Sequence, residues 1–122
     1  MEKTKGQLEA EISAAITKFE KEHLGRGPEE ANTFIINDMI LIRLKGVLTP
    51  AEEKLAGDNE GARLIKQVRR RLIESSRPLL EKIIQNIIGL KATSLHTDIS
   101  SRTGERIFVL CFNKNIESDI SN

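Results

Sequence analysis

The chain has 122 residues, of which 39% are hydrophobic and 30% charged, a length and composition typical of one globular domain that folds without staples. Nineteen basic and eighteen acidic residues give a net charge of +1, which argues against a general binder of nucleic acid or anionic lipid. The one cysteine excludes an intramolecular disulfide, and the absence of Trp and Tyr leaves few stacking platforms for bases or sugars. No N-terminal apolar run follows the first residues, so we expect neither a signal peptide nor a membrane span, and a cytoplasmic location.

The N-terminal part predicts one helix followed by a β-hairpin. The helix covers residues 3–24 and ends at Gly25. Its apolar residues recur at helical spacing: Leu8, Ile12, Ile16 and Phe19. Two β-rich runs, residues 33–36 and 39–45, flank a tight turn at residues 37–38. Both faces of the second run are mostly apolar.

The middle of the chain predicts a short helix and then a long one. Residues 49–52 form a capping box with proline at the first helical position, and the helix that they start stops at Gly57. Residues 58–59 cap the long helix. Its predicted apolar stripe consists of Leu64, Ile65, Val68, Leu72, Ile73, Leu80, Ile84 and Ile88. Pro78 removes a backbone hydrogen bond within this pattern, so we expect a kink or break near Arg77.

The C-terminal part predicts a second hairpin. Its strands cover residues 95–100 and 106–112, joined by a turn at residues 101–104. The second strand is apolar on both faces, which is typical of a strand covered on two sides. We therefore expect a single domain over residues 1–113, with a polar, flexible tail over residues 114–122.

This order of elements, α-ββ-αα-ββ, predicts an α+β fold in which three to four helices pack on a four-stranded, mostly antiparallel sheet. Two strand pairs that are apolar on both faces need more cover than helices on one side supply. We therefore expect a homodimer that buries the second sheet face or an edge, with a helix on each face as the alternative.

His96 and Asp98 are the residues with the most catalytic character. They lie two apart on a strand, so they share a face, and a carboxylate beside an imidazole can orient it as a general base or metal ligand. Two residues make an incomplete site, and a hydrogen-bonded polar pair at a strand end is the favoured interpretation. Cys111, which the register could bring opposite Ser94, is interpreted as a small core hydrophobe. We expect no enzyme activity, no cofactor and no metal.

Two sets of basic residues are candidates for binding. A stripe on the long helix fits phosphates or an acidic protein face, although a solvated helix face would show the same pattern. The stripe consists of Arg63, Lys66, Arg70 and Arg77. The second set is expected to converge near the last turn and to bind a small anion or nucleotide. It consists of Arg26, Arg102 and Arg106.

Several short segments together resemble one bacterial family. They are residues 5–9, 25–28, 44–52, 68–70, 77–80, 95–100 and 104–106. The resemblance is to the MpsC-like family, named for the C component of a sodium-translocating, membrane-potential-generating system and catalogued as a domain of unknown function. It covers the chain from near residue 4 to about residue 113. The resemblance implies an association with membrane components of cation or inorganic-carbon uptake, and it supplies no catalytic residues.

These observations favour an accessory or regulatory protein of the cytoplasm that acts by binding protein, for example a membrane transporter subunit, without inserting into the membrane itself. The alternative is a sensor of a small anion or nucleotide. A third hypothesis, an enzyme using His96 and Asp98, lacks a nucleophile or metal ligand set.

Overall fold

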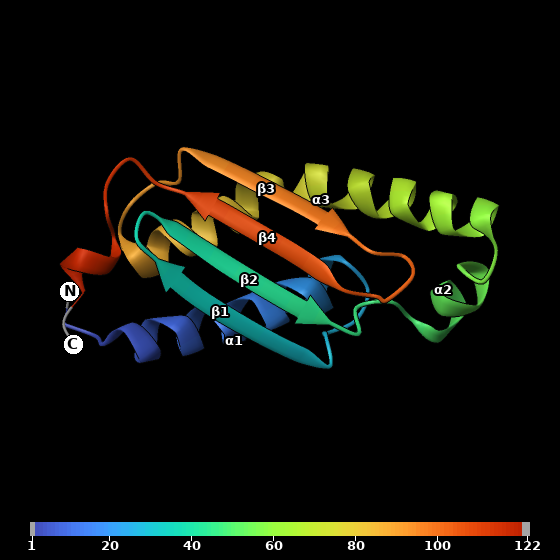
Figure 1. Ribbon diagram of the computed structural model, residues 1–122, viewed down its shortest axis with the longest axis horizontal. Coiled ribbons are helices and arrows are strands. Elements are labelled where there is room, and N and C mark those ends of the chain that lie inside the picture. The colour runs from blue at the N-terminus through green and yellow to red at the C-terminus, as the bar shows by residue number, and fades with distance from the viewer. Residues whose placement is uncertain (1, 121–122) are drawn as a thin grey trace.

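A four-stranded antiparallel sheet carries two long helices on one of its faces (Figure 1). The computed structural model describes residues 2–120. The strands lie in the order β1-β2-β4-β3, so two hairpins join at the centre of the sheet through β2 and β4. The element order confirms the predicted α+β class.

The first helix, α1 (Lys5–His23), begins at a capping box that the sequence analysis did not identify. The Thr4 hydroxyl accepts a hydrogen bond from the Gln7 backbone N–H at 3.2 Å, and the Gln7 side chain accepts one from the Thr4 N–H at 2.9 Å. Gly25, with φ at 122°, follows the helix in a backbone conformation that glycine adopts readily. The predicted extent of this helix is therefore confirmed to within two residues.

The first hairpin consists of β1 (Glu30–Ile36) and β2 (Met39–Lys45). Asn37 adopts a φ of 54° in the turn, which confirms the predicted turn. β1 pairs along the whole of β2, and therefore begins at residue 30 instead of the predicted residue 33. In the second hairpin, β3 (Ser94–Ile99) and β4 (Arg106–Cys111) pair as predicted, with β3 at the sheet edge.

The short helix α2 (Pro50–Leu55) packs against the start of α3 (Asn59–Ile88). The predicted capping box of α2 is confirmed, and Asp58 caps α3 by accepting a hydrogen bond from the Gly61 N–H at 2.7 Å. A Cβ atom on Gly61 would lie 1.8 Å from the Leu55 carbonyl oxygen. Only glycine permits this close approach of the two helices, so Gly61 serves packing.

α3 continues through Pro78 as one helix, so of the predicted kink or break near Arg77 the break was wrong, and the kink stays a prediction. Contacts on both sides of the proline hold the helix. Arg77 donates a hydrogen bond to the Leu95 carbonyl oxygen of β3 and pairs with Glu81, and Leu80 is fully buried. Pro78 itself is exposed, where its ring meets no core atoms.

The predicted apolar stripe of α3 is correct at five positions and wrong at three. The buried aliphatic residues are Ile65, Ile73, Leu80, Ile84 and Ile88. The exposed ones are Leu64, Val68 and Leu72. The buried face includes Arg69, and this explains the error, because a pattern search for aliphatic residues shifts the predicted face away from a buried arginine.

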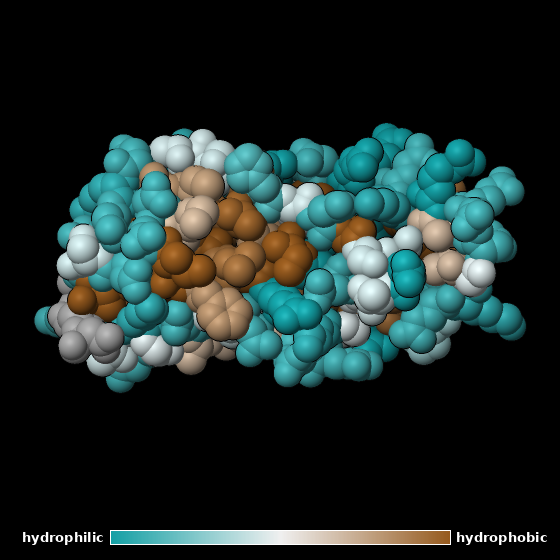
Figure 2. Space-filling view, viewed as in Figure 1, coloured by the Kyte–Doolittle hydropathy of each residue, from teal (hydrophilic) through white to brown (hydrophobic). Residues whose placement is uncertain are grey.

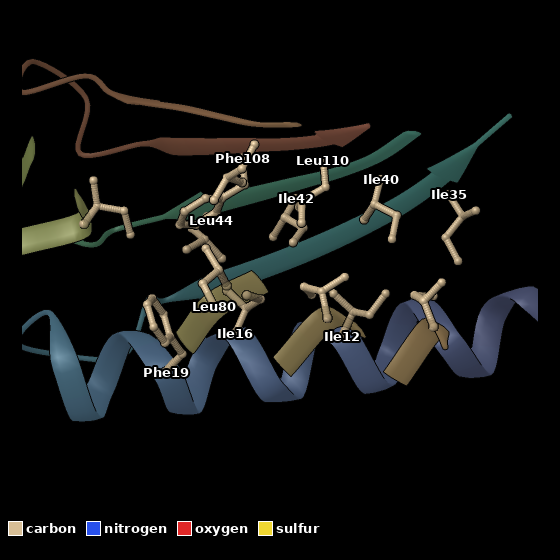
Figure 3. Close-up of a cluster of buried hydrophobic side chains, with 14 of the residues drawn as sticks. Ile12, Ile16, Phe19, Ile35, Ile40, Ile42, Leu44, Leu80, Phe108 and Leu110 are labelled. Atoms are coloured by element: carbon tan, nitrogen blue, oxygen red, sulfur yellow. The ribbon is translucent and has the colours of Figure 1, made fainter. Parts of the chain in front are cut away.

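The core fills the space between the inner face of the sheet and the two long helices (Figure 3). Its sheet side chains include Ile40, Ile42, Leu44, Phe108 and Leu110, and α1 contributes Ile12, Ile16 and Phe19. Both α1 and α3 lie on this one face (Figure 1), so the alternative of a helix on each face was wrong. The physical reason is that the buried side chains of both helices pack on the same alternate strand positions.

The outer face of the sheet carries an apolar patch that none of the helices within residues 2–120 covers (Figure 2). Phe34 and Ile36 are 46% and 41% exposed. The half-buried members of this patch are Met39, Leu41, Ile107, Val109 and Cys111. The prediction that the last hairpin is covered on two sides was therefore wrong for the single chain.

The segment after β4 packs on the domain up to residue 120, whereas a flexible tail was predicted over residues 114–122; residues 121–122 lie outside the described part of the chain. It contains the short 3-10 helix η1 (Glu117–Asp119), flanked by buried Ile116 and Ile120. The Glu117 carboxylate accepts hydrogen bonds from the Lys5 ammonium at 2.7 Å and the Asn37 N–H at 2.8 Å. The polar composition of this segment did not predict these contacts, because only two isoleucines of residues 114–120 are buried against the domain.

Candidate functional site

Four charged side chains meet in the interior where the three helices approach β4. Glu20 comes from α1, Glu52 from α2, Arg69 from α3 and Arg106 from β4. Glu20 is fully buried, and each arginine is only 1% exposed. Charged groups are rarely buried unless they are paired, so this cluster is the least ordinary feature of the core. Of the four, the sequence analysis singled out only Arg106 as a binding residue and Glu52 as part of a helix cap.

Arg69 and Glu52 form a fully bonded pair. The guanidinium donates to the two Glu52 carboxylate oxygens at 2.5 and 2.9 Å, to the Leu24 carbonyl at 2.8 Å and to the Val47 carbonyl at 2.9 Å. Burial raises the pKa of Glu52, but the hydrogen bonds from Arg69 and Thr49 outweigh it and hold the pKa below its usual value. One arginine thus fastens the end of α1, the loop after β2 and the start of α2 to α3.

Glu20 and Arg106 form a pair of a different kind. Arg106 Nε lies 4.0 Å from Glu20 Oε2, too far for a hydrogen bond. Within residues 2–120, both Glu20 carboxylate oxygens and the Nε and Nη2 atoms of Arg106 have no hydrogen-bond partner. Arg106 Nη1 donates to the Thr97 hydroxyl at 3.0 Å, and the guanidinium lies 5.5 Å from the Phe108 ring centroid.

The environment of this pair displaces the pKa values of both groups. Burial raises the pKa of Glu20 to about 7, although the positive charges of Arg106 and Arg69 act in the opposite direction. Burial also lowers the pKa of Arg106, which the Glu20 carboxylate opposes. Glu20 can therefore gain or lose a proton near neutral pH. Arg106 loses its counterion when Glu20 gains the proton and regains it when Glu20 loses the proton.

A cavity of about 90 Å³ lies beside Arg106, between α3 and β3. Its lining comprises Lys66, Arg70, Ile73, Glu74, Thr97, Asp98, Ile99 and Arg106. A shallower hollow adjoins it, shares Lys66 and Asp98, and includes Arg102. The structure thus brings Arg106 and Arg102 to neighbouring hollows. Arg26 lines neither and pairs with Glu29 at 3.2 Å.

The predicted basic stripe of α3 divides into two kinds of residue. Lys66 pairs with Asp98 at 3.4 Å, and Arg77 bonds to the β3 backbone, so both fasten α3 to the edge strand. Arg63 and Arg70 are exposed, and neither has a hydrogen bond or ion pair within residues 2–120. The sequence analysis identified the stripe correctly as a helix face but not this division of roles, which depends on the position of β3.

A second stripe, three of whose four members were predicted to lie in the core, is on the other side of the buried face of α3. It consists of Leu64, Val68, Leu72 and Leu79, which are between 37% and 48% exposed. We call these four residues the aliphatic stripe. Exposed apolar side chains are ordinary when scattered, but several of them on one face of a helix mark a contact surface.

His96 and Asp98 share the outer face of the sheet but have separate partners. His96 Nε2 lies 3.1 Å from the Ser94 hydroxyl, and the Asp98 carboxylate accepts a hydrogen bond from the Ile99 N–H at 2.9 Å. Burial raises the pKa of Asp98, yet the bond from Ile99 and the Lys66 charge bring it below its usual value. Ser94 lies opposite Cys111 in the ladder. Within the described part of the chain, no three His, Cys, Asp or Glu residues are grouped to hold a metal ion.

The chain is similar to two curated Bacillus subtilis (strain 168) proteins, each named as uncharacterized. YbcI is 48% identical over 120 residues, which is 98% of this chain and 97% of that protein. YrhF is 28% identical over 109 residues, which is 88% of each. No solved structure matches the chain significantly.

A family profile described as "Na+-translocating membrane potential-generating system (MpsC)" matches residues 4–114. Among the helices of residues 2–120, none combines the length and apolar character needed to cross a membrane. Because the profile covers most of the chain and YbcI is nearly half identical along its whole length, the chain belongs to the MpsC family.

Proposed function

We propose that the protein is a non-enzymatic accessory or regulatory subunit that acts by binding another protein of a membrane-potential-generating ion-translocation system, on its cytoplasmic side. The family description supports the link to such a system. The observation that carries a binding role is the aliphatic stripe of α3, four large apolar side chains exposed in a row on a rigid helix.

The geometry of the aliphatic stripe suits an amphipathic helix or a groove of a partner protein. Its members lie at positions i, i+4, i+8 and i+15 of α3, the spacing by which one helix face anchors in a groove. Arg71 is exposed beside it. An apolar row with an arginine at its border favours a partner that presents aliphatic and acidic side chains.

We further propose that the outer face of the sheet forms a homodimer. The apolar patch around Phe34 and Ile36 lies on the face opposite to the helices, so self-association there leaves α3 accessible. A two-fold interface uses the same patch on both subunits, and stable interfaces bury about 800 Å² per partner. Phe34 and Leu41 face each other across the β1–β2 ladder and provide the centre of this patch.

The test is co-purification of the tagged protein from its native host in mild detergent. We expect a polytopic membrane protein to accompany the wild type and to be lost from the double variant Leu64→Glu/Val68→Glu. These positions are exposed, so the thermal unfolding of the variant should match the wild type.

Phe34→Lys is the matched control, because it places a charge on the other exposed apolar surface. We expect this variant to retain the membrane partner and to shift from dimer to monomer in analytical ultracentrifugation. Retention of the partner by the folded α3 double variant would contradict the assignment of α3 as the binding face.

A further inference from the structure

A buried arginine with incomplete hydrogen bonding lines the cavity between α3 and β3. Arg106 is 1% exposed and lines this cavity, and its Nε and Nη2 atoms bond to nothing within residues 2–120. Nearly all buried polar groups in proteins have a partner, and each exception needs an explanation. Binding of an outside acceptor in the cavity beside this guanidinium would provide such an explanation.

The remaining lining of the cavity specifies the charge of that acceptor. Lys66 and Arg70 face it from α3 and Arg106 from the sheet, against the carboxylates of Glu74 and Asp98. Asp98 is already paired with Lys66 at 3.4 Å. The lining therefore has three cations for two carboxylates, and this excess of positive charge favours an anionic acceptor.

The size of the cavity limits the ligand to a small one. A volume of about 90 Å³ is enough for a single tetrahedral or planar oxyanion. We propose that this cavity is a binding site for a small oxyanion, held by Arg106, Arg70 and Lys66. The site is separate from the aliphatic stripe, so it extends the proposed function with a ligand that the partner-binding face does not require.

The affinity of this site for an anion depends on the protonation state of Glu20. Its carboxylate stands 4.0 Å from Arg106 and competes with an anion for the same guanidinium. The other charged groups around the pair are Arg69 of α3, which Glu52 neutralises, and Asp98 of β3. Protonation of Glu20 leaves Arg106 without a counterion, so an oxyanion binds most tightly when Glu20 is neutral.

Sulfate is the appropriate probe because its charge is constant across neutral pH. Isothermal titration at constant ionic strength, balanced with chloride, should show saturable sulfate binding that is about tenfold weaker at about pH 8 than at about pH 6, since the binding-competent fraction falls by that factor above a pKa of about 7. In Glu20→Gln, the affinity should become independent of pH.

Two arginines on the same helix provide the matched variants. Arg70→Ala should abolish sulfate binding, whereas Arg63→Ala, which is equally exposed but outside the cavity, should leave it unchanged. Both side chains are solvent-exposed, so both variants should fold. No saturable binding, binding that survives in Arg70→Ala, or a wild-type affinity that is equal at both pH values would each overturn the proposal.

Discussion

Two ion pairs are buried under the same sheet, and they differ in how completely their polar atoms are bonded. Arg69 donates four hydrogen bonds to a carboxylate and two backbone carbonyls. Arg106 is equally buried, makes one hydrogen bond, and stands 4.0 Å from its carboxylate. The residue types and the burial of the arginines are the same, so neither distinguishes the two pairs. The pairs differ in the carboxylate, which is 21% exposed in Glu52 and fully buried in Glu20, and in the arrangement of hydrogen-bond partners.

The difference indicates different roles. A buried ion pair offsets its desolvation cost only with good geometry and additional hydrogen bonds, and the Arg69 pair has both. It connects α1, α2 and α3, so we assign it a role in stabilising the fold. The Glu20–Arg106 pair lacks those bonds and borders a cavity. Its unmet bonding capacity is what makes it a candidate for ligand and proton binding.

The largest expected effect comes from removing the bonded arginine. Arg69→Met should lower the free energy of unfolding by about 3–5 kcal/mol, because it leaves the Glu52 charge and the Leu24 and Val47 carbonyls without their donor. Urea unfolding near pH 7 measures this. The control is Arg71→Met on the exposed side of α3, and a loss as small as that of the control would show that the Arg69 pair does not secure the fold.

The second effect is a pH dependence of the free energy of unfolding, and the ionisation of Glu20 determines its sign. Its folded pKa of about 7 exceeds its usual value of 4.5, so the folded state retains a proton that the unfolded state releases. The stability that this proton contributes is fully present below the usual pKa of 4.5. It is lost as the pH rises through the folded-state pKa of about 7. The loss is on the order of 3 kcal/mol between about pH 5 and pH 8.

The variant Glu20→Gln isolates this contribution. It should flatten the decline of the unfolding free energy on the alkaline side in urea titrations at several pH values. The carboxylate of the other pair should behave oppositely, because the pKa of Glu52 is lowered and its stabilisation is lost as the pH falls. If the unfolding free energy of Glu20→Gln varied with pH in parallel to that of the wild type, the raised pKa of Glu20 would be contradicted.

The smallest effect concerns the local support of the bonded pair. Thr49 caps α2, accepting a hydrogen bond from the Glu52 N–H at 3.2 Å and donating its own N–H to the Glu52 carboxylate at 2.9 Å. Thr49→Ala should cost about 1 kcal/mol. Thr4→Ala at the equivalent cap of α1 is the comparison in the same urea assay, and it should cost a similar amount because that cap also has both reciprocal bonds. A Thr49→Ala loss of several kcal/mol would instead mean that the cap positions the Arg69 pair.

Local signals in the sequence predicted the parts of the fold that depend on near neighbours. The capping box at residues 49–52, the turn at Asn37 and the β4 strand all depend on residues close in the chain. The element order then sufficed for the α+β class. The helix of the long crossover was found, but its buried face was misplaced because Arg69 occupies a core position.

The candidate site could be predicted only in part. Arg106 was identified as basic and close to a turn, but its burial depends on the two helices that cover the inner face of the sheet. Glu20 was missed altogether, since its partner lies far along the chain and a lone glutamate in a charged helix carries no signal. The outer sheet patch was foreseen as a surface that needs cover.

The central claim is that the Glu20–Arg106 pair is held ready for a proton and a ligand, while the Arg69–Glu52 pair holds the fold. The most direct measurement is a carbon-13 NMR titration of the Glu20 side-chain carboxyl, assigned with Glu20→Gln. We predict a midpoint at about pH 7 that moves higher when sulfate is added. A midpoint at or below the usual value of 4.5, unchanged by sulfate, would contradict the account.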